Sequence, residues 1–327
     1  MTQQPYYTTA APQKKKKIPS WVWVVLVCLL LIVLIAVLAQ AVNKKNAEGD
    51  SLLPVGGLDY VAVLHVEGTM TESGSNSYLS AESYDQEYLL NTLSALSEDD
   101  HNKGLLLYID SPGGEVMAAS DLGDAVVAYK EATGRPVYAY GHNYAASGGY
   151  WLAAAADRFF VNRYCTTGSI GVTFGTMLDL SGLLEKYGIR TNTITSGAQK
   201  SMGSSMEPMS DETRAIFQSF IDEYYGYFID WVCEQRGMDR QQLLALADGR
   251  IYTATQAVAN GLADQVGDYD DCLNALLDAV GGEPEVEDFQ PSTPVNWRSL
   301  LGSSKSGEID SLLRLLPPTG ALAYYGN

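Results

Sequence analysis

The chain has 327 residues, of which 46% are hydrophobic, enough to build one or two domains with a buried core. Its net charge is −18, but residues 1–46 contain six lysines and no acid, so the remainder carries 15 basic residues against 39 acidic ones. Such a negative surface repels nucleic acid and anionic lipid headgroups, and we expect the folded part to bind neither.

A run of 22 residues, from Trp21 to Val42, contains Gln40 as its only polar side chain. As a helix rising about 1.5 Å per residue, it is long enough for the hydrocarbon core of a membrane, about 30 Å thick. Lys14–Lys17 outweigh Lys44 and Lys45, so the positive-inside rule predicts a cytoplasmic tail over 1–20 and an extracytoplasmic main part.

A cleaved signal peptide is the alternative, because Ala39-Gln40-Ala41 resembles a cleavage site. The apolar run is longer than the usual signal-peptide core of about 7–15 residues. We therefore predict an uncleaved transmembrane helix over 21–42, which anchors the protein in the cell membrane. A linker over 43–57, a folded domain over 58–280 and a flexible C-terminal segment over 281–327 follow.

Strands and helices alternate along the folded domain. Strands are predicted over 60–66, 104–110, 136–140 and 158–162, with an extended stretch over 191–195. Helices are predicted over 115–132, 147–156, 178–187 and 210–236, and further helices to about residue 280. This alternation indicates an α/β layered fold with a largely parallel sheet.

The helix that Ser210 caps is rich in aromatic residues. Among the aromatic residues between positions 217 and 231 are Phe217, Phe220, Tyr224, Tyr227, Phe228 and Trp231. This apolar surface is either a contact between subunits or ordinary core packing. The cysteines, in contrast, suggest no special chemistry. Cys165, Cys233 and Cys272 follow the apolar run with neither a disulfide framework nor metal-ligand spacing, so we expect buried free thiols and no metal site.

Ser147 lies in the small-residue sequence Ala145-Ala146-Ser147-Gly148-Gly149-Tyr150, at the predicted start of a helix. A serine nucleophile needs a neighbouring base, and all three histidines precede Ser147 in the chain. The candidate base is Lys200, in a loop of small residues over 195–204, where burial would lower the pKa of its amine. The alternatives are an ordinary helix-capping serine and a solvated surface lysine.

Two further turns follow predicted strands. Asp110-Ser111-Pro112-Gly113-Gly114 leads into a helix, and its backbone N–H groups are suited to stabilise an oxyanion together with the N–H of Gly148. Thr166 to Val172 forms a Gly/Ser turn in which Ser169 is placed to hydrogen-bond a neutral lysine amine. Taken alone, the Gly114 turn is better explained as an ordinary strand-to-helix connection.

Together these motifs resemble signal peptide peptidase A, a family of membrane-anchored serine/lysine peptidases. The matching pieces are residues 110–114, 145–157, 168–172, 196–200 and 248–253 with the continuation 257–267. The resemblance covers about residues 58–280. It implies a Clp/crotonase-like layered fold of repeated ββα units, and a single nucleophile motif makes the chain similar to the short form.

The resemblance also implies site roles. Ser147 is the nucleophile and Lys200 the general base, while the N–H groups of Gly114 and Gly148 form the oxyanion hole. It further implies a ring- or dome-shaped homo-oligomer in which the serine and lysine of one site can come from adjacent subunits. Asp110 stands where asparagine is also common, and Gln199 precedes the lysine where the family varies; neither departure affects the dyad.

The expected function is cleavage of remnant signal peptides or other membrane-proximal peptides by a serine endopeptidase without metal or other cofactor. A Clp-type Ser/His/Asp peptidase takes its histidine from after the serine, where this chain has none. An acyl-CoA-binding crotonase relative needs acids or a cofactor pocket and rarely carries a membrane anchor. An inactive scaffold at the membrane is the remaining alternative, which the presence of both Ser147 and Lys200 opposes.

Overall fold

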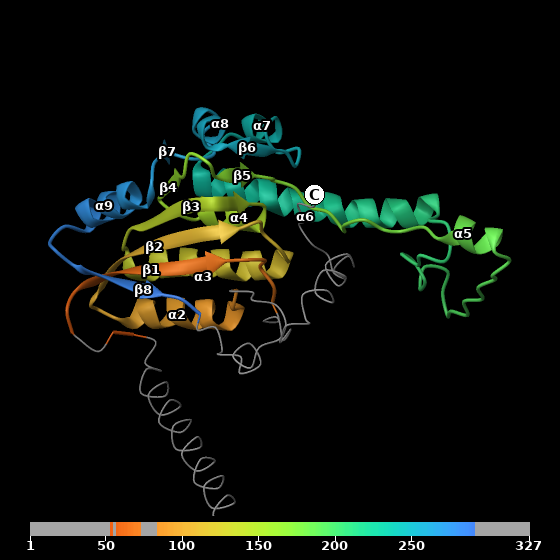
Figure 1. Cartoon of the computed structure of the whole chain (residues 1–327), viewed down its shortest axis with the longest axis horizontal. Helices are drawn as coiled ribbons and strands as arrows, with labels where there is room; N and C mark the ends of the chain where they lie inside the picture. The colour runs from red at the N-terminus through yellow and green to blue at the C-terminus, as the bar shows by residue number, and fades with distance from the viewer. Residues whose placement is uncertain (1–52, 55–56, 73–83, 292–327) are drawn as a thin grey trace, which may run out of the picture. The chain divides into compact units, whose positions relative to one another are not determined.

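Eight strands form one sheet in the computed structural model, which describes residues 53–54, 57–72 and 84–291 (Figure 1). The strands are β1 (Tyr60–Glu67), β2 (Asn102–Ser111), β3 (Val137–Ala146), β4 (Arg158–Val161), β5 (Thr166–Gly168), β6 (Ile251–Thr253), β7 (Gln265–Val266) and β8 (Glu285–Phe289). Their order is β6-β5-β3-β2-β1-β8, and β4 pairs with both β3 and β7. All pairs are parallel except β5 with β6.

Helices cover both faces of this sheet. They are α2 (Gln86–Glu98), α3 (Val116–Thr133), α4 (Gly148–Ala154), α5 (Ser181–Lys186), α6 (Asp211–Arg236), α7 (Arg240–Leu244), α8 (Ala254–Ala259) and α9 (Tyr269–Val280). A large core joins one face of the sheet to α2, α3 and α4, and a smaller core joins the other face to α9.

Strand β2 shows why the central strands read as continuous apolar runs. Leu105 and Leu107 point into the large core, whereas Leu106 points into the smaller one, and all three are fully buried. A parallel strand covered on both faces requires apolar residues at every position rather than at alternate ones. β1, β2 and β3 are parallel, so their carboxyl ends lie at the same edge of the sheet. The motif residues lie at this edge.

Helix α6 has two different halves. Its last turns bury Phe228, Ile229 and Val232, and Trp231 stacks on Trp151 of α4 with ring centroids 4.8 Å apart. Its first half extends away from the sheet toward α5, as Figure 1 shows. We call residues 171–226 the arm: they comprise the chain from the end of the β5 turn through α5 and the first half of α6. Thr213 is the arm's only buried residue.

Core packing is therefore confirmed for part of the aromatic helix, whereas the contact between subunits stays a prediction. Phe228 and Trp231 are core residues, whereas Phe220 and Tyr227 are exposed large aromatic side chains. Ser210 caps the helix as predicted, its side chain accepting a hydrogen bond from the Thr213 N–H, and Gly237 ends it in the left-handed conformation.

The mixed α/β fold predicted from the sequence is confirmed. The predicted tail over 1–20 and membrane helix over 21–42 lie outside the described residues, and among the described ones no helix is both long and apolar enough to cross a membrane. Two local expectations differ from the structure. Residues 191–195 are exposed and form no strand, and β8 lies inside the segment 281–327 that was expected to be flexible. β8 is held by its pairing with β1 and by the burial of its last residue, Phe289, in the large core.

Candidate active site

Ser147 occupies the junction between β3 and α4. Its backbone has φ 54° and ψ −119°, a positive φ that is costly for a residue with a side chain. Ser147 is 2% exposed, and its Oγ has no hydrogen-bond partner among the described residues. A buried hydroxyl without a partner is costly, so this serine is held in place for something other than stability.

The loop after β2 approaches the Ser147 turn very closely. A Cβ added to Gly113, where φ is +94°, would lie 2.5 Å from the Gly148 N and 2.8 Å from the Ser147 Cβ. At Gly114 a Cβ would lie 2.0 Å from the Met70 carbonyl oxygen. Only glycine allows these approaches.

Two backbone donors are left free by this packing. Within the described part of the chain, neither the Gly114 N–H nor the Gly148 N–H donates a hydrogen bond to another residue. Gly148 is the first residue of α4, where N–H groups have no acceptor inside the helix. The arrangement is suited to bind an oxyanion formed beside Ser147.

A hollow of about 480 Å³ opens beside Ser147. Ser169 lines it together with Ser147, so the structure brings these two predicted site residues together. Ser169 also has a positive φ, 52°, and its N–H donates to the Arg250 carbonyl oxygen at 2.8 Å. Among the described residues, no histidine lines this hollow.

The far wall of the hollow comes from segments whose role the sequence did not reveal. Ile221 and Tyr225 of α6 line it, as do residues 247–249. Ile221 and Tyr225 are four residues apart and therefore lie on the same side of α6. This spacing is visible in the sequence and could have indicated that they share a surface. The motif residues 248–253 support this wall through β6, since the Gly249 N–H donates to the Ile170 carbonyl oxygen at 3.1 Å.

Asp248 adds a fixed negative charge at the hollow. The guanidinium of Arg250 hydrogen-bonds its carboxylate, with Nε 2.6 Å from Oδ1, and this lowers the pKa of Asp248 to about 2. The carboxylate therefore stays ionised over the range in which most proteins are folded. It is paired with Arg250 rather than directed at Ser147.

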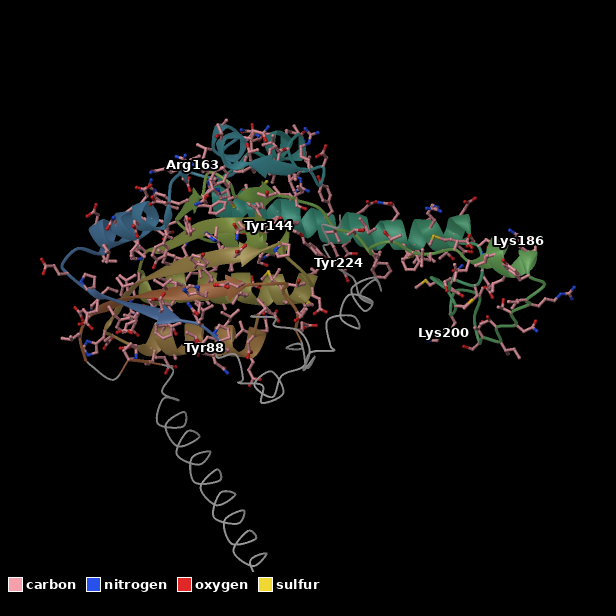
Figure 2. All side chains as sticks on the ribbon, viewed as in Figure 1. Tyr88, Tyr144, Arg163, Lys186, Lys200 and Tyr224 are labelled. Carbon is pink, nitrogen blue, oxygen red and sulfur yellow. The ribbon has the colours of Figure 1, made fainter. Side chains whose placement is uncertain are left out.

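Lys200 lies elsewhere, in the arm. It is exposed, and its ammonium forms no hydrogen bond or ion pair within the residues that the structure describes. Figure 2 shows Lys200 on the same side as Lys186, well away from Tyr144, which precedes Ser147 by three residues. A single copy of the chain thus does not bring Lys200 to Ser147, and it does not provide the burial that was expected around this amine.

The loop that carries Lys200 is nevertheless held in a defined way. Gln199 accepts a hydrogen bond from the Thr213 hydroxyl at 2.9 Å, and the Ser210 hydroxyl donates to the same Thr213 oxygen at 2.9 Å. Gln199 and Thr213 also line a second hollow of about 490 Å³, which Ser147 does not reach. The first turn of α6 thereby fixes the loop next to Lys200.

The three cysteines of the described residues are free thiols. Cys165, Cys233 and Cys272 are unpaired, and burial raises the pKa of both Cys165 and Cys272 to about 12, which keeps these thiols protonated. No group of three or more metal-ligating side chains occurs in the described ranges.

Comparison with known proteins places this arrangement in context. A family model described as Peptidase family S49 matches residues 129–281, and one described as Clp protease matches 78–170. A signal peptide peptidase SppA of Enterococcus faecium is 34% identical over 275 residues, covering 78% of this chain and 79% of that protein. A protease of Methanocaldococcus jannaschii is 32% identical over 271 residues, covering 82% and 86%.

A phage protein is also similar. The capsid assembly protease C of Escherichia phage lambda is 30% identical over 241 residues, which are 74% of this chain and 52% of the phage protein. These matches confirm the resemblance that the motifs indicated.

Proposed function

Since this chain belongs to peptidase family S49, we propose that it is a membrane-anchored serine endopeptidase with Ser147 as nucleophile and Lys200 as general base. The observation that carries the proposal is the buried, unpartnered Oγ of Ser147, held at positive φ beside two free backbone N–H groups. Such a hydroxyl lacks one thing for catalysis, a base to accept its proton.

The reaction follows from these groups. The neutral amine of Lys200 accepts the Ser147 proton while Oγ attacks the scissile carbonyl carbon, and the N–H groups of Gly114 and Gly148 stabilise the oxyanion. The C–N bond then breaks, and Lys200 returns the proton to the leaving amine. Water attacks the acyl-enzyme ester and gives a proton to Lys200. The bond between the acyl carbon and Oγ then breaks, Lys200 passes that proton to Oγ, and the peptide acid leaves. Ser169 holds the lysine amine toward Ser147.

The two halves of the dyad come from different copies of the chain. Support for this comes from the exposure of Lys200 in the arm and from the apolar side chains around it. Ile194 is 97% exposed, and Leu183, Ile189 and Met202 are also exposed. Packing this arm on a second copy would bury apolar surface at about 25 cal/mol per Å² and would desolvate Lys200. The proposed assembly is the homo-oligomeric ring that the resemblance implies.

The substrates are remnant signal peptides or other hydrophobic peptides near the membrane. The run from Trp21 to Val42 is the reason for this choice, because it would hold the catalytic domain at the outer surface of the cell membrane. No cofactor enters the reaction, since the serine, the lysine and the backbone donors supply each proton transfer and charge stabilisation.

A serine-reactive fluorophosphonate probe tests the dyad on the full-length protein. We expect wild type to be labelled at Ser147, and both Ser147→Ala and Lys200→Ala to lose labelling and peptide hydrolysis while remaining folded. Labelling of Ser147→Ala at the wild-type rate would remove Ser147 from the mechanism. An unlabelled, inactive wild type would instead favour the scaffold alternative.

Topology is tested separately. Protease added to intact cells without their wall should digest the domain that follows Val42. Protection of that domain would contradict the proposed orientation.

A further inference from the structure

The pairing of β2 with β3 is interrupted just before the catalytic serine. Ile109 pairs with Gly141, and the next pair is Ser111 with Ala145. Three residues of β3, 142–144, therefore lie opposite a single residue of β2, which is Asp110. Such a bulge bends the strand and re-aims the residues that follow it.

The carboxylate of Asp110 holds this bulge. Its Oδ2 accepts a hydrogen bond from the Asn143 side-chain amide at 2.7 Å, and its Oδ1 accepts one from the Tyr144 backbone N–H at 3.1 Å. Asn143 and Tyr144 are exposed, whereas Asp110 is half-buried. Hydrogen bonds to an ionised acceptor are stronger than those between neutral groups. The carboxylate can therefore hold this exposed segment, whose polar groups would otherwise hydrogen-bond to water.

The bulge ends where the catalytic turn begins. Ala145 resumes the pairing, and its carbonyl oxygen accepts a hydrogen bond from the Thr167 hydroxyl at 2.6 Å. Ser147 then donates its N–H to the Gly168 carbonyl oxygen at 2.8 Å. The path of Tyr144 thus determines where the next three residues place the Ser147 hydroxyl.

The residue next to Asp110 fixes the opposite side of the site. The Ser111 hydroxyl donates to the Gly68 carbonyl oxygen at 2.7 Å and accepts from the Gly113 N–H at 3.1 Å. Ser111 therefore holds the loop with the Gly114 donor, and Asp110 holds the strand that leads to Ser147. Two consecutive residues at the end of β2 set the separation between nucleophile and oxyanion hole.

We infer that Asp110 is a positioning residue for Ser147, acting through the β3 bulge that its carboxylate holds. This inference rests on the proposed function, since it concerns the rate at which Ser147 is acylated. Asp110 touches neither Ser147 nor the hollow beside it, so its removal should change the orientation of the nucleophile without removing a catalytic group. Small displacements of a reacting group can cost up to about 100-fold in rate.

An asparagine side chain at position 110 is expected to hold the bulge as the aspartate does. Its carbonyl oxygen can accept from the Tyr144 N–H, and its amide can donate to Asn143 once the Asn143 amide has turned over. Alanine can do neither. Asp110→Asn should therefore keep the bulge, and Asp110→Ala should lose it.

Asp99 provides a matched control at the other end of β2. It is also half-buried, and its carboxylate also accepts one backbone and one side-chain hydrogen bond, from the His101 N–H at 2.9 Å and from the Tyr60 hydroxyl at 2.7 Å. Asp99→Ala should destabilise the fold about as much as Asp110→Ala, without affecting the catalytic turn.

The experiment measures the rate constant for fluorophosphonate acylation, and kcat and KM for peptide hydrolysis, in the full-length variants. We expect Asp110→Ala to slow acylation and to lower kcat roughly tenfold or more, with KM changed less than threefold. Asp110→Asn should stay within about threefold of wild type. Asp99→Ala should match wild type in acylation, whatever its Tm.

Two other results would overturn the inference. One is equal acylation of Asp110→Ala and wild type; the other is an equal loss in Asp110→Ala and Asp99→Ala, which would indicate a general effect of stability. Asn143→Ala tests whether Asp110 acts through Asn143. If it does, Asn143→Ala should lower the acylation rate less in the Asp110→Ala variant than in wild type. These results are distinct from failure of the proposed function, in which wild type itself is not acylated at Ser147.

Discussion

The sheet body, which contains Ser147, and the arm, which contains Lys200, differ in how far their side chains are buried. In the body, Ser147 is 2% exposed, and the strands around it are buried on both faces. In the arm, Lys200 and most of its neighbours are exposed, and a single buried side chain, Thr213, ties the loop to α6. Ser147 therefore lies in a well-packed body, with residues of the arm lining the hollow beside it, whereas Lys200 lies on an exposed loop.

Helix α6 connects these two regions. Its last turns are fixed to α4, the helix that follows Ser147, because the Trp231 indole donates to the Trp151 carbonyl oxygen at 2.9 Å in addition to stacking on its ring. Its first half carries the Lys200 loop and aromatic contacts such as Phe174 on Phe217, with ring centroids 5.3 Å apart. Changes in the packed body should therefore lower stability, whereas changes at exposed positions of the arm should leave the stability of a single subunit unchanged.

Substitution of Lys200 should give the largest effect with the smallest structural cost. Lys200→Ala should lose activity on the order of 1000-fold or more, as expected for one member of a unit that acts together. Lys200→Arg should be equally inactive, since a guanidinium does not act as a base near neutral pH. Because Lys200 is exposed, Tm of the isolated subunit should not change. The exposed Lys186, also in the arm, is the matched control: Lys186→Ala should keep wild-type kcat/KM, and a comparable loss there would deny Lys200 a specific role.

Gly114→Ala should damage both activity and stability, as a change within the body. Its new Cβ would lie 2.0 Å from the Met70 carbonyl oxygen, so the loop must move and the oxyanion donor moves with it. We expect kcat to fall about 100-fold or more, the cost of losing one oxyanion donor, and Tm to fall as well. Gly182, in the arm, has open space around it, so Gly182→Ala should change neither quantity. Normal kcat in Gly114→Ala would exclude this loop from the oxyanion hole.

Thr213→Val should give an intermediate effect confined to activity. The substitution keeps the shape of the side chain but removes the hydroxyl that holds Gln199, the neighbour of Lys200. We expect kcat to fall roughly tenfold, because the base becomes less well placed. Thr213→Ser keeps the hydroxyl and should recover most of the rate. An equal loss in both variants would show that the hydrogen bond is not what matters.

Asp264→Asn should change stability and leave the chemistry intact. The carboxylate accepts two hydrogen bonds from Arg236, both at 2.9 Å, and Arg236 is largely buried. Burial raises the pKa of Asp264, but the bonds from Arg236 and from the Phe159 N–H outweigh it, so this pKa lies below its ordinary value of 3.8. Breaking the pair should cost about 2 kcal/mol near neutral pH.

The pH dependence of that loss follows from the direction of the shift. A lowered pKa in the folded state contributes stability that is fully present above pH 3.8 and is lost as the pH falls through the folded value. The difference in Tm between wild type and Asp264→Asn should therefore shrink in acid. Asp230→Asn breaks the exposed pair with Arg240 and should cost less than about 1 kcal/mol. A difference that grows in acid would contradict the assigned charge state of Asp264.

The sequence predicted the body better than its edges. β1, β2 and β3 were recognisable because a buried parallel strand is apolar throughout, and Ser210 marked the start of α6. Helix α2 was not predicted, although Leu89, Leu93 and Leu96 recur at helical spacing. β8 was missed because its acidic sequence forms a strand only through pairing with β1.

The candidate site divides in the same way. The small residues around Ser147 and the Gly113-Gly114 turn were recognisable in the sequence, but the close approach of Gly113 to Gly148 became visible only in the structure. The bulge opposite Asp110 was not predictable, because it depends on the register between two strands. The exposure of Lys200 was not predictable either, because the hydrogen bond that holds its loop, between Thr213 and Gln199, joins residues 14 positions apart.

Subunit mixing tests the division between body and arm most directly. Inactive Ser147→Ala subunits supply an intact arm, and inactive Lys200→Ala subunits supply an intact body. After verified exchange of subunits between the two oligomers, we predict that peptide hydrolysis recovers toward a quarter of the wild-type rate, because some interfaces then join Ser147 of one copy to Lys200 of another. No recovery after exchange would show that each chain completes its own dyad and would contradict the division that we propose.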